Sequence, residues 1–313
     1  MSLLQTRSDD VSVAVAAELT AVIVAVTHGQ PRVLTIDKGQ ALPSGPFEAS
    51  HRSLQAGLRS WVETQTRHPL GYVEQLYTFA DADRKQGTIG RVVSVSYLGL
   101  TREAPAAAGW GAEWQPWYRF FPWEDVRGAG AALTEAVLAG PLHAWAESAD
   151  DPGMARDRLR RIAINFGLDG QRWNEEFVLQ RYETLWEAGL VAEAGAARAA
   201  VAPGEAMRHD HRRILATGIA RLRAKIKYRP VVFELMPEAF TLLQLQRTVE
   251  ALGGRLLHKQ NFRRLIDQQD LVEETGEVTT ETGGRPAKLF HFRREVLAER
   301  QVAGTKLPLV RAV

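Results

Sequence analysis

The last third of the chain has an order of elements that leaves few folds open to it. Apolar residues recur at helical spacing over 242–252, and Gly253-Gly254 ends this helix. A tight connection leads to a second helix over 258–269, and residues 271–292 then read as a β-hairpin. The positions of the second helix that we expect to face the core are Phe262, Leu265 and Ile266.

Helix, short turn, helix and hairpin is the order of a winged helix-turn-helix. Charge placement agrees, because residues 206–313 hold 20 basic and 12 acidic side chains, whereas residues 1–205 hold 19 and 25. A small basic unit on a larger acidic body is typical of a nucleic-acid reader attached to another domain.

The exposed start of the second helix and the hairpin are the candidate DNA-binding surface. Lys and Arg can address guanine or phosphates, and Asn or Gln can pair with adenine. The alternative is that these are solvated charges on an ordinary helix. The residues predicted to bind double-stranded DNA are His258, Lys259, Gln260, Asn261, Arg263 and Arg264 on the helix, with Arg285 and Lys288 on the wing.

The first part of the chain has a different pattern. β-branched runs at 18–26 and 33–36 predict a hairpin, and 72–79 and 92–100 predict two further strands. Ser53 is a plausible N-cap for a helix over 53–65. Antiparallel strands around one early helix make an α+β domain.

From about residue 126 the sequence becomes alanine-rich, with aromatic residues at helical spacing, which indicates a helical insertion. Residues 192–205 are low in complexity and read as a flexible linker. A connecting helix over 214–228 should place basic residues opposite its apolar face. The predicted organisation is a sensing domain (1–126), an insertion and linker (127–205), a connecting helix (206–228), a DNA-binding domain (229–297) and a tail (298–313).

Composition excludes several classes of protein. There is no cysteine, so disulfides, a thiolate nucleophile and cysteine-ligated metals are impossible. No apolar run approaches the roughly 18 residues of a membrane span, and the first ten residues lack the apolar core of a secretory signal. We therefore expect a cytoplasmic protein with no membrane association.

One stretch, LPSGPFEASHRSLQAGLRSWVETQTRH (42–68), resembles the Nudix box. Gly45, Arg59 and Glu63 match its pattern. A Nudix hydrolase needs several carboxylates on one helix face to hold Mg²⁺. Here most are missing, so we expect no metal site, no catalytic residues and no required cofactor, and an ion pair between Arg59 and Glu63. The replaced positions are His51, Ser60, Thr64 and Thr66.

Three further segments extend the resemblance. YVEQLYTFADADRKQGTIGRVVSVSYLGL (72–100) is similar to the ADP-ribose branch of the Nudix superfamily, and FFPWEDV (120–126) resembles its late W-F-P-x-D-L motif. Residues 228–292 resemble the C-terminal winged helix of the Nudix-related, NrtR-type regulators of NAD metabolism. The insertion resembles the longer, NadQ-like alphaproteobacterial form.

The resemblance implies a Nudix-like α/β/α sandwich with a helical insertion and a C-terminal winged helix-turn-helix. It implies a ligand-responsive repressor of NAD biosynthesis or salvage genes, acting as a homodimer on operator DNA. The implied effector is ADP-ribose or another NAD-related adenine nucleotide.

Candidate effector-binding residues lie on the two later strands. Glu74, Tyr77 and Phe79 should line the cleft, and Arg91 opens the next strand, near where a diphosphate would lie. Each could equally be structural.

Two alternative functions are an active Nudix hydrolase of ADP-ribose or another nucleoside diphosphate derivative, and a protein–protein adaptor that uses the insertion. The missing carboxylates count against the hydrolase, and the helix-turn-helix with its wing counts against the adaptor.

Overall fold

The computed structural model describes residues 15–80, 91–103, 111–195, 201–280, 286–293 and 295. Its centre is a six-stranded mixed sheet of order β4-β5-β1-β2-β6, with β3 paired to β1. β1 runs parallel to β5, and the other pairings are antiparallel. The strands are β1 (Val15–Thr27), β2 (Gln30–Thr35), β3 (Ser44–Pro46), β4 (Tyr72–Phe79), β5 (Arg91–Leu100) and β6 (Glu113–Pro116).

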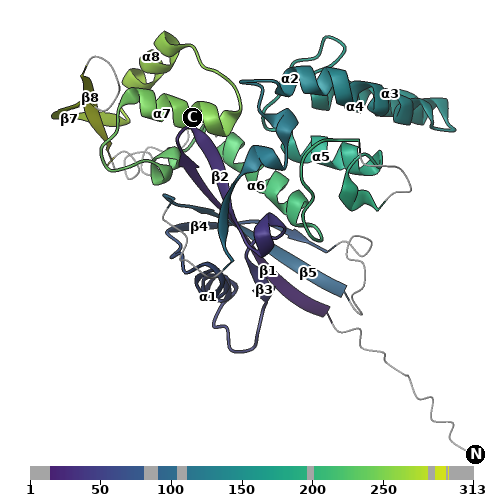
Figure 1. Ribbon diagram of the computed structural model, residues 1–313, viewed down its shortest axis with the longest axis horizontal. Helices are drawn as coiled ribbons and strands as arrows, with labels where there is room; N and C mark the ends of the chain where they lie inside the picture. Colours follow the sequence, from purple (N-terminus) through teal and green to yellow (C-terminus); the bar gives the residue numbers. More distant parts are fainter. Residues whose placement is uncertain are drawn as a thin grey trace, which may run out of the picture.

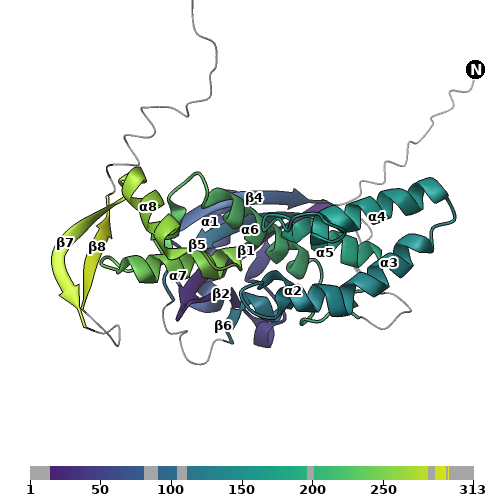
Figure 2. The ribbon, with the colours of Figure 1, turned by 90° about the horizontal axis from the view of Figure 1, so that it is seen from above.

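Helices cover both faces of this sheet and extend from it in two directions. Figure 1 shows α1 on one side of the sheet and α6 on the other. Figure 2 shows the insertion helices α3 and α4 at one end of the molecule and the wing, β7 and β8, at the other. The helices are α1 (Leu54–Thr66), α2 (Gly130–Leu133), α3 (Ala139–Glu147), α4 (Pro152–Phe166), α5 (Val178–Glu187), α6 (His211–Lys225), α7 (Leu242–Gly253) and α8 (Lys259–Gln269). The wing strands are β7 (Val272–Thr279) and β8 (Ala287–Phe292), and short helical turns occur at Asp37–Gly39, Trp117–Arg119, Pro122–Glu124, Thr134–Leu138, Ala192–Ala194 and Val231–Leu235.

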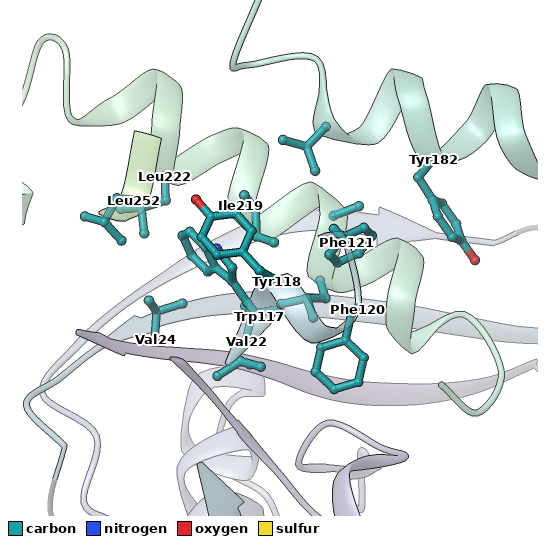
Figure 3. Close-up of a cluster of buried hydrophobic side chains, with 14 of the residues drawn as sticks. Val22, Val24, Trp117, Tyr118, Phe120, Phe121, Tyr182, Ile219, Leu222 and Leu252 are labelled. Carbon is teal, nitrogen blue, oxygen red and sulfur yellow. The ribbon is translucent and has the colours of Figure 1, made fainter. Parts of the chain in front are cut away.

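The sandwich forms because β1 is apolar on both faces. Side chains alternate along a strand, so Leu19 and Ile23 pack under α1 while Val22 and Val24 pack under α6. Figure 3 shows the second of these cores, in which aromatic residues of the segment after β6 lie between the sheet and α6. The expected α+β class, with helices on both faces of a sheet, is confirmed.

Local signals in the sequence place several elements well. Ser53 caps α1, its Oγ accepting a hydrogen bond of 3.1 Å from the amide of Ala56. The β1–β2 hairpin turns at His28-Gly29, both with positive φ. No helix in the described ranges has the length and apolar character needed to cross a bilayer.

Two expectations are wrong. Leu265 is 51% exposed, because the core of the winged helix is reached by Phe262 and Ile266, one turn apart, and Leu265 points to one side. The connecting helix buries Arg212, Arg223 and Lys225 instead of presenting all its basic residues to solvent. In the described part of the expected linker, the amide of Ala202 donates to the Leu190 carbonyl at 2.9 Å, and the flexibility of 192–205 stays a prediction.

A fully buried ion cluster, Glu124–Arg181–Arg223, joins the parts of the chain. Arg181 of α5 donates to the Glu124 carboxylate through Nε and Nη2 at 2.6 and 2.8 Å, and Arg223 of α6 donates through Nη1 at 2.6 Å. The three side chains have no exposed surface. Burial alone would raise the pKa of the Glu124 carboxyl, but the two guanidinium groups hold this pKa below its usual range.

The same cluster reaches the winged helix. Arg223 Nε donates to the Leu252 carbonyl at 2.8 Å, and the Tyr118 hydroxyl donates to the Ala251 carbonyl at 2.6 Å. Gly254 ends α7 with a φ of 68°, and a β-carbon there would overlap the Glu124 carbonyl oxygen. The segment after β6, the insertion and α6 therefore meet at the Glu124 carboxylate, and α7 is joined to this cluster through two of its backbone carbonyls.

We predict that Glu124→Gln lowers the free energy of unfolding by about 3–5 kcal/mol, because two buried guanidinium groups lose their only shared carboxylate. Since the pKa of Glu124 is lowered on folding, its contribution is present at neutral pH and is lost as pH falls through that lowered pKa. Urea unfolding of both proteins, repeated at acid and neutral pH, measures this.

Glu187→Gln is the matched control, since Glu187 pairs with Arg161 on the surface and both are about 40% exposed. That variant should change stability by less than about 1 kcal/mol. A similarly small change in the free energy of unfolding for Glu124→Gln would contradict a stabilising role of the Glu124–Arg181–Arg223 cluster.

Candidate functional site

The start of α8 presents a row of exposed polar and basic side chains. The helix is anchored by Phe262 and Ile266, which are 7% and 8% exposed and belong to the core that includes Leu245 and Leu252 of α7. Within the part of the chain that the structure describes, Lys259, Arg263 and Arg264 have no acidic partner. The exposed positions are those expected from the sequence: His258, Lys259, Gln260, Asn261, Arg263 and Arg264.

The wing differs in charge from the sequence expectation. Lys288 lies on β8, but its ammonium group donates to both carboxylate oxygens of Glu274 at 2.9 Å. Glu273 and Glu277 add to the acidity of β7. A phosphate contact by Lys288 would have to compete with Glu274, and the other predicted wing residue, Arg285, lies outside the described residues.

The wing is attached to the residues before α7. Phe240 and Phe290 exchange two backbone hydrogen bonds of 2.9 and 2.8 Å, and the rings of Phe233 and Phe292 stack at 4.1 Å. The bridge between Phe240 and Phe290 attaches the β7–β8 hairpin to the segment before α7, and Figure 1 shows the hairpin next to α7 and α8. The wing is therefore attached to the same unit that carries α7 and α8.

Neutral contacts hold the Nudix-box segment together. Gln65 and Ser44 exchange side-chain and backbone hydrogen bonds of 3.1 and 2.7 Å, and Trp61 Nε1 donates to the Pro46 carbonyl at 2.8 Å. A β-carbon at Gly45 would overlap the Trp61 ring. His51, at the position of the first Nudix glutamate, accepts the Glu48 amide through Nδ1 at 3.0 Å.

The expected ion pair between Arg59 and Glu63 is wrong. Arg59 instead donates to the carbonyls of Leu70 and Gly71, which leaves Glu63 exposed on α1. The described residues contain no group of three or more acidic or histidine side chains arranged to hold a metal ion.

The candidate effector residues on β4 have different environments. Glu74 accepts the Tyr72 hydroxyl at 2.8 Å and forms an ion pair with Lys225 of α6, whose pKa is lowered by burial and by the charge of Arg229. Phe79 is 4% exposed and lies under the guanidinium of Arg213 at 4.6 Å.

Tyr77, in contrast, is 58% exposed, so of these three residues it is the one open to a ligand. Arg91 begins β5, but its side chain lies outside the described part of the structure.

Sequence reasoning missed the Glu124 cluster. The carboxylate lies in the FFPWEDV segment, which carried the family resemblance, but its partners lie 57 and 99 residues away. No local pattern distinguishes Arg181 or Arg223 from an arginine on a solvated helix face.

Comparisons with known proteins agree with this architecture. Residues 232–292 match the family model described as the NrtR DNA-binding winged helix domain. The ADPR responsive transcriptional repressor NtrR of Acinetobacter baylyi is 40% identical over 83 residues, which are 26% of this chain. The match spans about a third (33%) of that relative's length.

Two solved structures share the overall fold. Shewanella oneidensis NrtR complexed with a 27mer DNA superposes with a TM-score of 0.55 and 21% identity, covering 90% of this chain and 95% of that one. A MutT/nudix family protein from Enterococcus faecalis gives a TM-score of 0.52 and 16% identity, covering 94% and 90%.

The fold and the α8 surface define a winged helix protein built on a Nudix-like domain. The segment 232–292 matches the NrtR winged helix model, and the expected resemblance to the Nudix-related NrtR-type regulators is confirmed. The finer resemblance to the longer NadQ-like form stays a prediction.

We predict that Arg263→Ala and Arg264→Ala each weaken binding to an operator fragment. A lost base contact should cost about 1–3 kcal/mol and relax preference at one position. A lost phosphate contact should weaken all sequences alike and flatten the salt dependence by about 0.9 in log–log slope. Fluorescence anisotropy at several salt concentrations separates the two.

Arg160→Ala, an exposed arginine of α4 in the insertion, is the control and should leave DNA affinity unchanged. Wild-type affinity in both α8 variants would show that α8 is not the recognition helix.

Proposed function

We propose that this chain is a ligand-responsive transcriptional repressor of NAD biosynthesis or salvage genes. Its α8 reads operator DNA, and its Nudix-like domain binds ADP-ribose or another NAD-related adenine nucleotide. The observation that carries the proposal is the exposed row Lys259, Arg263 and Arg264, which has no acidic partner among the described residues and lies on a winged helix that matches the NrtR model. A repressor of bacterial genes acts in the cytoplasm, where the operator lies.

The similar proteins support both parts of the proposal. The Acinetobacter relative is named an ADPR responsive repressor, and Shewanella NrtR was solved with DNA. The neutral hydrogen bonds across the box fit a domain that binds a nucleotide without cleaving it.

Capture of genomic DNA fragments tests this function directly. Immobilised full-length protein should enrich fragments upstream of NAD biosynthesis or salvage genes, and added ADP-ribose should release them, as the family resemblance favours. The Arg263→Ala/Arg264→Ala double variant is the matched bait and should enrich none of them. Equal enrichment of random fragments by both baits would overturn the proposal.

We predict no appreciable hydrolysis of ADP-ribose with Mg²⁺ or Mn²⁺. Glu63 is the only carboxylate on α1, and a cation that dehydrates reluctantly is held poorly by one carboxylate. Release of AMP is measured by chromatography. Metal-dependent turnover at an ordinary enzymatic rate, about 1 s⁻¹ or faster, would contradict this and favour the Nudix hydrolase.

We predict a homodimer on a palindromic site. One winged helix reads a few base pairs, and two-fold symmetry doubles the contacts at half-sites about one helical turn apart. Light scattering of the free protein and of its DNA complex measures the mass. A monomer in both samples would count decisively against it.

A further inference from the structure

The part of α6 that packs along β4 carries three basic side chains, Arg213, Arg221 and Lys225. The first and the last of these form ion pairs. Arg221 and Lys225 are four residues apart and are neighbours on the helix surface, and Arg213 lies eight residues before Arg221. Arg213 lies over the ring of Phe79 of β4, and Arg221 lines a groove with Tyr77 of β4. Lys225 pairs with Glu74, and Arg213 pairs with Glu183 of α5. Among the residues that the structure describes, no acidic side chain pairs with Arg221, which is exposed.

An exposed aromatic ring lies on β4, the strand along which α6 packs. Tyr77 of β4 is 58% exposed, although its ring packs at 4.9 Å from the buried ring of Phe79. Its carbonyl accepts the Ser96 hydroxyl at 2.8 Å, which fixes the strand at this point. The backbone of Tyr77 is therefore held in the sheet, while more than half of the residue's surface stays open to solvent.

Tyr77 and Arg221 line the same groove, which lies between β4, α5 and α6 and has a volume of about 460 Å³. This volume is within the range of about 300–1,000 Å³ that small-molecule sites occupy. Glu176 also borders the groove, but Lys227 neutralises it at 2.6 Å. The remaining lining includes Leu76, Phe177, Gln180 and Thr217.

We infer that this groove binds the effector and that the helical insertion supplies one of its walls, an inference that rests on the proposed function. A base stacks on the Tyr77 ring, and the guanidinium of Arg221 holds a phosphate, as arginine does through two parallel hydrogen bonds. The ligand class is an anionic adenine nucleotide. Gln180, an exposed amide of α5, can pair with the edge of the base.

The position of the groove connects it to the DNA-binding unit. Two residues after Arg221, the same helix carries Arg223, which contacts Glu124 and the Leu252 carbonyl of α7. A ligand held between Tyr77 and Arg221 therefore acts on the helix that holds the winged helix in place.

Calorimetry of the full-length protein with ADP-ribose tests the assignment. Tyr77→Ala and Arg221→Ala should each weaken binding about tenfold or more, since one stacked base or one charge-assisted phosphate contact is worth that much. Tyr77→Phe should bind like the wild type because it keeps the stacking face. The controls are Tyr228→Ala, whose residue is 59% exposed outside the groove, and Arg160→Ala, and both should bind normally.

The outcomes separate this inference from the proposed function. Tight ADP-ribose binding that is unchanged in both groove variants would overturn the groove assignment and leave the repressor proposal standing. If the wild type does not bind ADP-ribose, AMP, ADP, ATP and NAD⁺ are titrated in turn. Binding of one of them that both variants weaken supports the groove, and no binding of any overturns it.

Discussion

The arrangement of the whole chain depends on the buried carboxylate of Glu124. Two guanidinium groups share it, and their remaining N–H groups donate to the carbonyls of Asn165, Asn174, Glu175 and Leu252. A buried charge is tolerated only when it is paired and its hydrogen bonds are satisfied. The insertion and α6 therefore cannot reorient separately without leaving a charge unpaired. α7 cannot move away without losing the hydrogen bond from Arg223 to the Leu252 carbonyl, and this contact holds the winged helix against α6.

This constraint gives a physical basis for sensing. A cluster that is either complete or broken favours discrete arrangements over gradual bending, and a ligand can bias such arrangements only by its differential affinity for them. The groove between β4, α5 and α6 lies along the helix that carries Arg223. In contrast, the box segment has become a neutral, hydrogen-bonded part of the scaffold, in which Gln65 and His51 make contacts that need no metal.

Sequence patterns predicted the elements but not the contacts between distant segments. Periodicity and caps placed α1, α7, α8 and both hairpins, because these depend on neighbours in the chain. The same reasoning placed the arginines of α6 in solvent, since periodicity cannot show that a carboxylate 99 residues away will meet Arg223. It also predicted, wrongly, that Leu265 faces the core and that Arg59 pairs with Glu63. At the candidate sites, the exposed row on α8 was predictable, whereas the pairing of Lys288 with Glu274 depends on the register of the wing.

We propose that nucleotide binding and DNA binding are coupled through the Glu124–Arg181–Arg223 cluster. Calorimetric titration of ADP-ribose into the full-length protein, with and without saturating operator DNA, tests it most directly. Coupling of about 1–3 kcal/mol predicts nucleotide affinities that differ by roughly 5–150-fold, with the same factor for operator affinity when the nucleotide is bound. If the nucleotide releases the DNA, the protein should bind the nucleotide more weakly with operator present than without it. Equal nucleotide affinities in the two titrations would contradict the account and leave a DNA-binding protein whose Nudix-like domain has no sensing role.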